Sequence, residues 1–161
     1  MPKAEKPVVM KLPRQVLPTL RKCDPKLAWL IDQVGPIAMA PPRQRTHLKT
    51  LCRSIVYQQL SGKAATTIFG RFRGLWDGAD FPTAQQIAKR SDEALRGCGL
   101  SGQKVSYLRD LSEKLVADPH FLSDVDDLED EAVIERLTSV RGLGRWSVEM
   151  FLMFHLGRLD V

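Results

Sequence analysis

The chain has 161 residues, of which 43% are hydrophobic and 27% charged, a composition typical of one globular domain. Its 24 Lys and Arg against 19 Asp and Glu leave a formal net charge of +5, which suits a polyanionic partner but does not require one. Cys23, Cys52 and Cys98 form no CxxC pair, which argues against a disulfide framework or a cysteine zinc site, and no apolar run is long enough to span a membrane.

The first 45 residues are rich in proline and basic residues, and we expect the first twenty to form an arm or to be disordered. One helix is predicted from about Pro25 to Val34. Its apolar positions are Leu27, Leu30, Ile31 and Val34. From Thr46 onward the pattern is helical, and no strand alternation of useful length occurs, so the chain is predicted to be all-α.

Capping residues and glycines divide residues 46–117 into several predicted helices. The first begins at about Thr46 and ends before Gly62, with Cys52 on its apolar face as a small core residue. The residues expected to cap the following helices are Ser61, Thr83 together with Gln86, Ser91 and Ser101. The last three of these helices are expected to run through Lys89, Arg96 and Ala117.

Residues 137–147, Leu-Thr-Ser-Val-Arg-Gly-Leu-Gly-Arg-Trp-Ser, form a glycine-paired turn between two predicted helices. Gly142 and Gly144 flank Leu143, so the backbone is free to take a positive φ on either side while Leu143 holds the turn to the core. The open N–H groups of the second helix suit an anion such as phosphate. The alternative is a tight turn whose glycines serve packing alone. The apolar stripe of the second helix is Val148, Phe151, Leu152, His155 and Leu156.

Three segments together resemble the helix-hairpin-helix DNA glycosylase superfamily, and within it the 3-methyladenine DNA glycosylase II branch. They are residues 51–65, which contain Gln-Gln-Leu-Ser, residues 99–108, and the turn at 137–147. The resemblance implies the all-α helix-hairpin-helix DNA glycosylase fold, with residues 1–45 as an N-terminal arm and first helix and residues 46–161 as the helical glycosylase domain. It also implies that the C-terminal part of that fold is absent from this chain.

The resemblance implies a function in base excision repair, the hydrolysis of the N-glycosidic bond of alkylated purines of the 3-methyladenine type after the base is flipped out of duplex DNA. The expected partner is double-stranded DNA containing alkylated bases. The protein is expected to be a monomer, or to have its fold completed by a second chain. The expected location is the cytoplasm or nucleoid of a bacterium, or the nucleus of a eukaryote. The alternative function is a non-catalytic DNA-binding helix-hairpin-helix module, and a third is a helical scaffold for other proteins.

The same resemblance implies that the amides of Gly142, Gly144 and Trp146 bind DNA phosphates, with Arg145 assisting. No organic cofactor and no iron–sulfur cluster is expected, but the family's hairpin binds a monovalent cation, Na or K, through main-chain carbonyls. Those carbonyls would here belong to Thr138, Val140 and Leu143. Two lysines just inside helix starts, Lys63 and Lys104, are further candidates for phosphate contacts, and the alternative is that they are only solvated.

The base pocket and the wedge are also carried over from the resemblance. Gln59 is expected to fill the gap left by the flipped base, with Gln58 beside it, and the alternative is a solvated helix end. Trp146 is expected to stack on the base, where its indole would attract a cationic purine, and the alternative is a core tryptophan. Met150 and Tyr57 are expected to line the same pocket, although core packing explains Met150 equally well and explains Tyr57 better. A tryptophan where bifunctional relatives have a lysine predicts a monofunctional enzyme.

No catalytic residue is assigned within the chain. The catalytic aspartate of the family is expected a few positions after Val161, and Asp160 matches an earlier, non-catalytic aspartate. The 161-residue chain alone is therefore expected to have little or no excision activity, since the carboxylate is the main source of transition-state stabilisation. His47 and His155 are expected to be structural, with His155 a satisfied core histidine.

Overall fold

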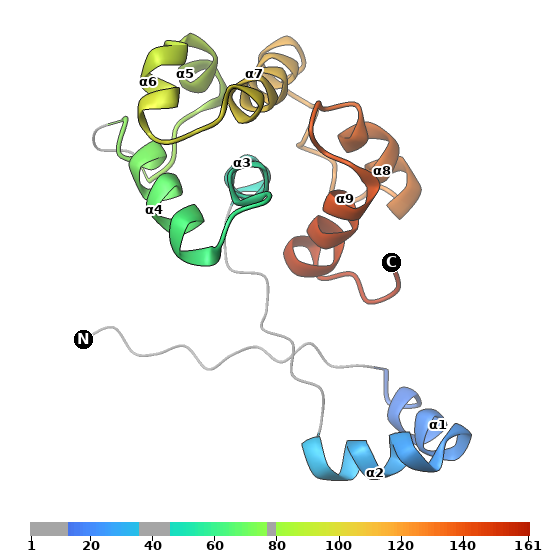
Figure 1. Ribbon diagram of the computed structural model, residues 1–161. Helices are drawn as coiled ribbons and strands as arrows, with labels where there is room; N and C mark the ends of the chain where they lie inside the picture. The colour runs from blue at the N-terminus through green and yellow to red at the C-terminus, as the bar shows by residue number, and fades with distance from the viewer. Residues whose placement is uncertain (1–12, 36–45, 77–79) are drawn as a thin grey trace, which may run out of the picture.

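A computed structural model describes residues 13–35, 46–76 and 80–161 (Figure 1). These residues form helices and no strands, as predicted. The helices are α1 (Val16–Cys23), α2 (Pro25–Val34), α3 (His47–Tyr57), α4 (Gly62–Arg73), α5 (Ala84–Lys89), α6 (Asp92–Gly97), α7 (Gly102–Ala117), α8 (Asp130–Thr138), α9 (Arg145–Phe151) and the π-helix η1 (Leu152–Leu156).

The predicted capping residues begin their helices because their side-chain oxygens accept hydrogen bonds from open first-turn amides. Ser61, Ser91 and Ser101 each accept from the amide three residues later. Thr83 and Gln86 form the complete capping box at the start of α5. These local signals explain why the helix starts agree with the sequence prediction.

Helix α1 corrects the prediction that the first twenty residues form an arm or are disordered. Residues 1–12 lie outside the described residues, but Val16–Cys23 is helical and contacts α2. Pro18 misled the sequence analysis, since a proline is tolerated in the first turn, where its missing N–H has no intrahelical partner. An ion pair between Arg21 and Asp32 joins the two helices, which lie apart from helices α3 to α9 in Figure 1.

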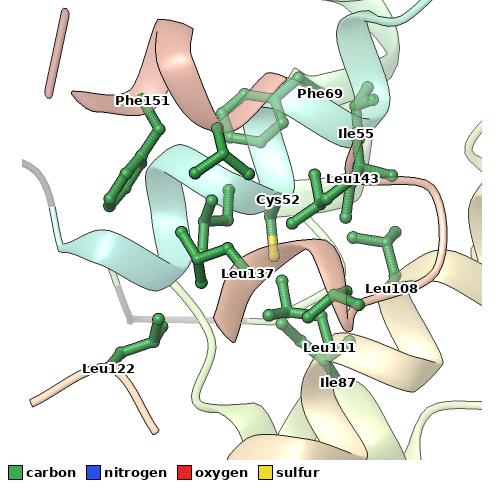
Figure 2. Close-up of a cluster of buried hydrophobic side chains, with 14 of the residues drawn as sticks. Cys52, Ile55, Phe69, Ile87, Leu108, Leu111, Leu122, Leu137, Leu143 and Phe151 are labelled. Atoms are coloured by element: carbon green, nitrogen blue, oxygen red, sulfur yellow. The ribbon is translucent and has the colours of Figure 1, made fainter. Parts of the chain in front are cut away.

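Helix α3 lies at the centre of residues 46–161 and contacts α4, α7 and α9 (Figure 1). Cys52 and Ile55 are fully buried in this centre, and Figure 2 shows them surrounded by leucines from α7 and α8 and by Leu143. Each fully buried aliphatic side chain of this size contributes about 1.5–3 kcal/mol to folding. The prediction that Cys52 is a small core residue is confirmed, and burial raises the pKa of its thiol.

The hairpin between α8 and α9 places its two glycines differently. Gly142 takes a φ of +83°, and a Cβ there would lie 2.1 Å from the Tyr107 ring. Gly144 takes a φ of −89°, and nothing would lie within 4 Å of an added Cβ. The prediction of a left-handed conformation therefore holds on one side of Leu143 only. Leu143 is buried, as predicted.

The second hairpin helix is not one continuous α-helix. It changes at Leu152 into the π-helix η1, which ends at Gly157 with a φ of +79°. A π-helical segment shifts the register of the following side chains, and such segments occur often at functional sites. Phe151 and Leu152 of the predicted stripe are buried, whereas His155 and Leu156 are only half-buried.

Candidate functional site

A cleft of about 450 Å³ lies between α3 and the α9–η1 segment. It is lined by Thr50, Arg53, Ser54, Tyr57, Gln58, Gln59, Trp146, Ser147, Met150, Phe151, Phe154 and His155. Tertiary folding thus brings the predicted pocket residues and both predicted wedge residues to one place. The roles assigned to these five residues stay predictions.

Trp146 is a strongly exposed aromatic residue of the cleft. It is 70% exposed, so the alternative of a core tryptophan is wrong. It begins the cleft wall directly after the hairpin, and Met150 follows one turn later on the same wall. An indole with this exposure is available to an incoming planar group.

Tyr57, on the opposite wall, is half-buried. The guanidinium carbon of Arg53 lies 3.8 Å from the centre of the Tyr57 ring, and the tyrosine hydroxyl hydrogen-bonds with Thr66. Arg53 was missed by the sequence analysis. The signal was its spacing, because residues four apart on a helix are neighbours. Arg53 therefore adds a positive charge to the cleft and covers one face of Tyr57.

The two glutamines after α3 have separate surroundings. The Gln58 Nε2 donates to the carbonyl oxygen of Gly142 at 2.7 Å, which ties the end of α3 to the hairpin. The alternative of a solvated amide is therefore wrong for Gln58. Gln59 is exposed and takes a φ of +55°, a conformation that non-glycine residues rarely adopt. Of the two, Gln59 is the more exposed.

Lys104 does not fit its predicted contact with phosphate. Its Nζ donates to the carbonyl oxygens of Val56 and Gln58, at 2.7 and 2.8 Å, and burial lowers the pKa of the amine. These carbonyls belong to the end of α3, where no intrahelical partner remains. Lys104 thus completes α3 from within the protein, whereas Lys63 is exposed at the start of α4.

The hairpin amides are open. Within the described ranges, no residue accepts a hydrogen bond from the amides of Gly142, Gly144 or Trp146, and Gly144 and Trp146 are exposed. The neighbouring Arg141 donates its own amide to Asp110 at 2.8 Å. Open N–H groups at the start of a helix are the arrangement that binds anions.

Arg145 is held by two carboxylates. Its guanidinium forms ion pairs with Glu131 and with Glu149, whose oxygen lies 3.0 Å from the Arg145 Nε. The hydrogen bond from Arg145 lowers the pKa of the Glu131 carboxyl. In turn, the hydrogen bonds to Glu131 and Glu149 raise the pKa of Arg145. Any phosphate at Arg145 must compete with these two partners.

His155 is hydrogen-bonded, as predicted. It is half-buried and lines the cleft, so the predicted core position is wrong. It contacts Thr50 and His47, and His47 in turn contacts Asp126. No Asp or Glu lines the cleft in the described part of the chain. The titratable side chains that do line it are those of Arg53, Tyr57 and His155.

Residues 52–150 match the family of HhH-GPD superfamily base excision DNA repair proteins. The chain belongs to this superfamily. Among curated HhH-GPD relatives, DNA-3-methyladenine glycosylase 1 of Schizosaccharomyces pombe is 39% identical over 112 residues, which are 69% of this chain and 49% of the relative. The chain thus spans about half the length of that protein.

Solved structures of HhH-GPD proteins have a fold similar to that of this chain. The S. pombe 3-methyladenine DNA glycosylase in complex with abasic DNA superimposes with a TM-score of 0.78 at 32% identity, covering 91% of this chain and 72% of that one. A DNA-3-methyladenine glycosidase of Bacillus halodurans gives 0.79 at 35% identity, covering 98% and 70%. The predicted all-α helix-hairpin-helix glycosylase fold is confirmed.

Proposed function

We propose that the chain forms part of a monofunctional DNA glycosylase that hydrolyses the N-glycosidic bond of alkylated purines, of the 3-methyladenine type, in duplex DNA. The observation that carries the proposal is the exposed Trp146 indole, which lies in a cleft directly after a turn with open amides. The names of the matching relatives point to the same activity.

The DNA backbone is proposed to bind at the hairpin. Phosphate oxygens would accept from the amides of Gly142, Gly144 and Trp146, which have no acceptor among the described residues. Arg145 would join when a phosphate replaces Glu131 or Glu149. Such contacts position the protein on DNA without reading its sequence.

The flipped base is proposed to enter the cleft and to stack on Trp146, with Met150 beside it. A volume of about 450 Å³ lies in the range of small-molecule pockets. An alkylated purine carries a positive charge, which an indole face attracts by about 1–2 kcal/mol when water is excluded. No lysine lines the cleft in the part of the chain that the structure describes, so water is the proposed nucleophile.

Gln59 is proposed as the wedge that fills the gap in the duplex. Its side chain is exposed at the tip of the α3–α4 turn and belongs to the cleft. An amide both donates and accepts, so it suits the orphaned partner base. Gln58 would support the wedge through its bond to Gly142.

The proposal includes a monovalent cation, Na or K, at the carbonyls of Thr138, Val140 and Leu143. Val140 accepts from the Leu143 amide at 3.1 Å, which leaves its second lone pair for an ion. Sites for Ca²⁺ and Mg²⁺ usually contain carboxylates, and no group of three His, Cys, Asp or Glu side chains that could hold a metal occurs in the described ranges. Neutral carbonyls therefore suit a singly charged ion.

The test is a binding titration with duplexes that carry a 2′-fluorinated 7-methylguanine, whose glycosidic bond resists cleavage. Trp146→Ala is expected to weaken the preference for this duplex over an unmodified one by about tenfold, through loss of stacking and cation–π attraction. Trp29→Ala is the matched control, because Trp29 is 65% exposed on α2 and does not line the cleft.

The same titration at two salt concentrations separates the alternatives. A glycosylase binds the lesion duplex preferentially, and its affinity falls with salt because phosphate contacts release counterions. A DNA-binding module without a base site would keep the salt dependence and show no preference for the lesion. A DNA affinity that changes neither with salt concentration nor with the lesion would contradict any DNA function.

A further inference from the structure

A chain of hydrogen bonds leads from the protein surface to the cleft. The Asp126 Oδ2 lies 3.2 Å from the His47 Nε2, the His47 Nδ1 lies 2.8 Å from the His155 Nε2, and the His155 Nδ1 lies 3.0 Å from the Thr50 Oγ1. The Asp126 side chain is 63% exposed and that of His47 is 22% exposed. Thr50 and His155 line the cleft.

The direction of each bond follows from the chemistry of the groups. A carboxylate only accepts, so the His47 Nε2 carries a hydrogen and the Nδ1 of a neutral His47 is an acceptor. The His155 Nε2 must then donate to His47, which leaves the His155 Nδ1 to accept the Thr50 hydroxyl. Every bond of the chain is satisfied while both histidines are neutral.

One added proton reverses the inner part of this chain. When His47 carries hydrogens on both nitrogens, its Nδ1 donates to the His155 Nε2, and the His155 Nδ1 donates to the Thr50 Oγ1. The Thr50 hydroxyl can then no longer donate to His155 and is free to donate into the cleft. The two histidines thus hold one shared proton, since a second would place two hydrogens between facing nitrogens 2.8 Å apart.

The described residues place these charged groups beside the pair. The loop after α7 contributes Asp126, and Arg158, after η1, donates to the Asp126 carbonyl oxygen at 3.3 Å. Helix α3 contributes Arg53 on the cleft wall. On the other side, His47 shares a groove with neutral residues from α5, α7 and the following loop, which are Ala84, Gln85, Leu115, Pro119, Leu122 and Ser123. Among the described residues, Asp126 is therefore the carboxylate that stabilises the shared charge.

We propose that His47 and His155 store one proton that Thr50 passes to an uncharged purine held in the cleft. The inference rests on the proposed function and extends its substrate class, because a neutral purine leaves more readily once protonated. Thr50 is the catalytic group that contacts the base, and the two histidines are positioning residues that act through it. Cationic purines would use the neutral form of the pair, which does not repel them.

The step conserves protons and electrons. His155 gives its Nδ1 hydrogen to the Thr50 oxygen while Thr50 gives its own hydrogen to a ring nitrogen of the base. The glycosidic bond then breaks with its electron pair moving to the base, which leaves uncharged. Water adds to the sugar and releases one proton, which restores the charged form of the pair.

The experiment compares a duplex carrying 2′-fluorinated deoxyinosine, an uncharged purine whose bond resists cleavage, with the same duplex carrying an abasic analogue. The ratio of the two affinities removes any general effect of histidine charge on DNA binding. It is expected to rise about tenfold from about pH 8 to about pH 5.5, since one charge-assisted hydrogen bond is gained. Thr50→Val and His155→Gln are expected to abolish this rise, and His120→Gln, a change at an exposed histidine, is expected to keep it.

Imidazole ¹⁵N spectra of the unbound chain provide a readout that does not need DNA. His47 and His155 are expected to gain the added proton together in one step, with the His47 Nε2 protonated throughout, and His120 serves as the reference outside the pair. Independent titration of the pair, or a pH-dependent ratio that survives Thr50→Val, overturns the relay. A lesion preference that does not change with pH overturns the relay and keeps the glycosylase function, whereas no lesion preference at any pH overturns both.

Discussion

The two walls of the cleft are built in opposite ways. The α3 wall is fixed from within the protein, because Lys104 of α7 donates to the carbonyls at its end and Gln58 donates to the Gly142 carbonyl. The α9–η1 wall presents Trp146 and Phe154, which are 70% and 60% exposed, and it changes from α- to π-helix halfway along. One wall is thus a fixed support, and the other offers its aromatic surface to a ligand.

Mutation at the contact between the hairpin and α7 is expected to have the largest effect on stability. Gly142→Ala is expected to destabilise the protein by about 3 kcal/mol or more, because the new Cβ would strike the Tyr107 ring at a φ of +83°. Gly144→Ala is the matched control, with open space and a φ of −89°, and is expected to cost about 1 kcal/mol or less, because Gly144 caps α9 and alanine is a poorer N-cap. Urea unfolding of both variants measures the difference, and equal losses would refute the asymmetry of the two glycines.

The fixed wall is tested at Lys104. Lys104→Met keeps most of the side-chain volume but leaves the Val56 and Gln58 carbonyls without their donor, at an expected cost of about 1–3 kcal/mol. The exposed Lys63 is the control, and Lys63→Met is expected to leave the unfolding free energy nearly unchanged. If Lys63→Met reduced stability as much as Lys104→Met, the end of α3 would not depend on its buried amine.

The charge on the hairpin side gives the smallest expected effect. Glu131→Gln removes one of the two carboxylates that hold Arg145, so DNA affinity at low salt is expected to rise about threefold and to fall more steeply with salt. Glu113→Gln removes the same charge from an exposed position on α7 and serves as the control. Equal gains for both variants would indicate a general charge effect instead of a freed Arg145.

Much of the fold could be predicted from the sequence because its signals are local. A serine or threonine before a helix, a glycine pair within a turn and an apolar spacing each act over a few residues, and they predicted most helix starts and the hairpin. Pro18 was the exception, since a proline fits the first turn of a helix as readily as it fits an irregular segment. The pocket residues Tyr57, Trp146 and Met150 were named from the family resemblance, and the fold brings them to one cleft.

The sequence by itself determined an all-α chain of the HhH-GPD superfamily, with a turn whose amides stay open. Only the tertiary structure decided which of the predicted site residues remain available to a ligand. Lys104 is 46 residues from the Gln58 carbonyl that it reaches, and His47 is 108 residues from His155. Such pairings depend on how helices pack, because no spacing along the chain encodes them. The π-helix that contains His155 is likewise not predicted by a helical apolar pattern.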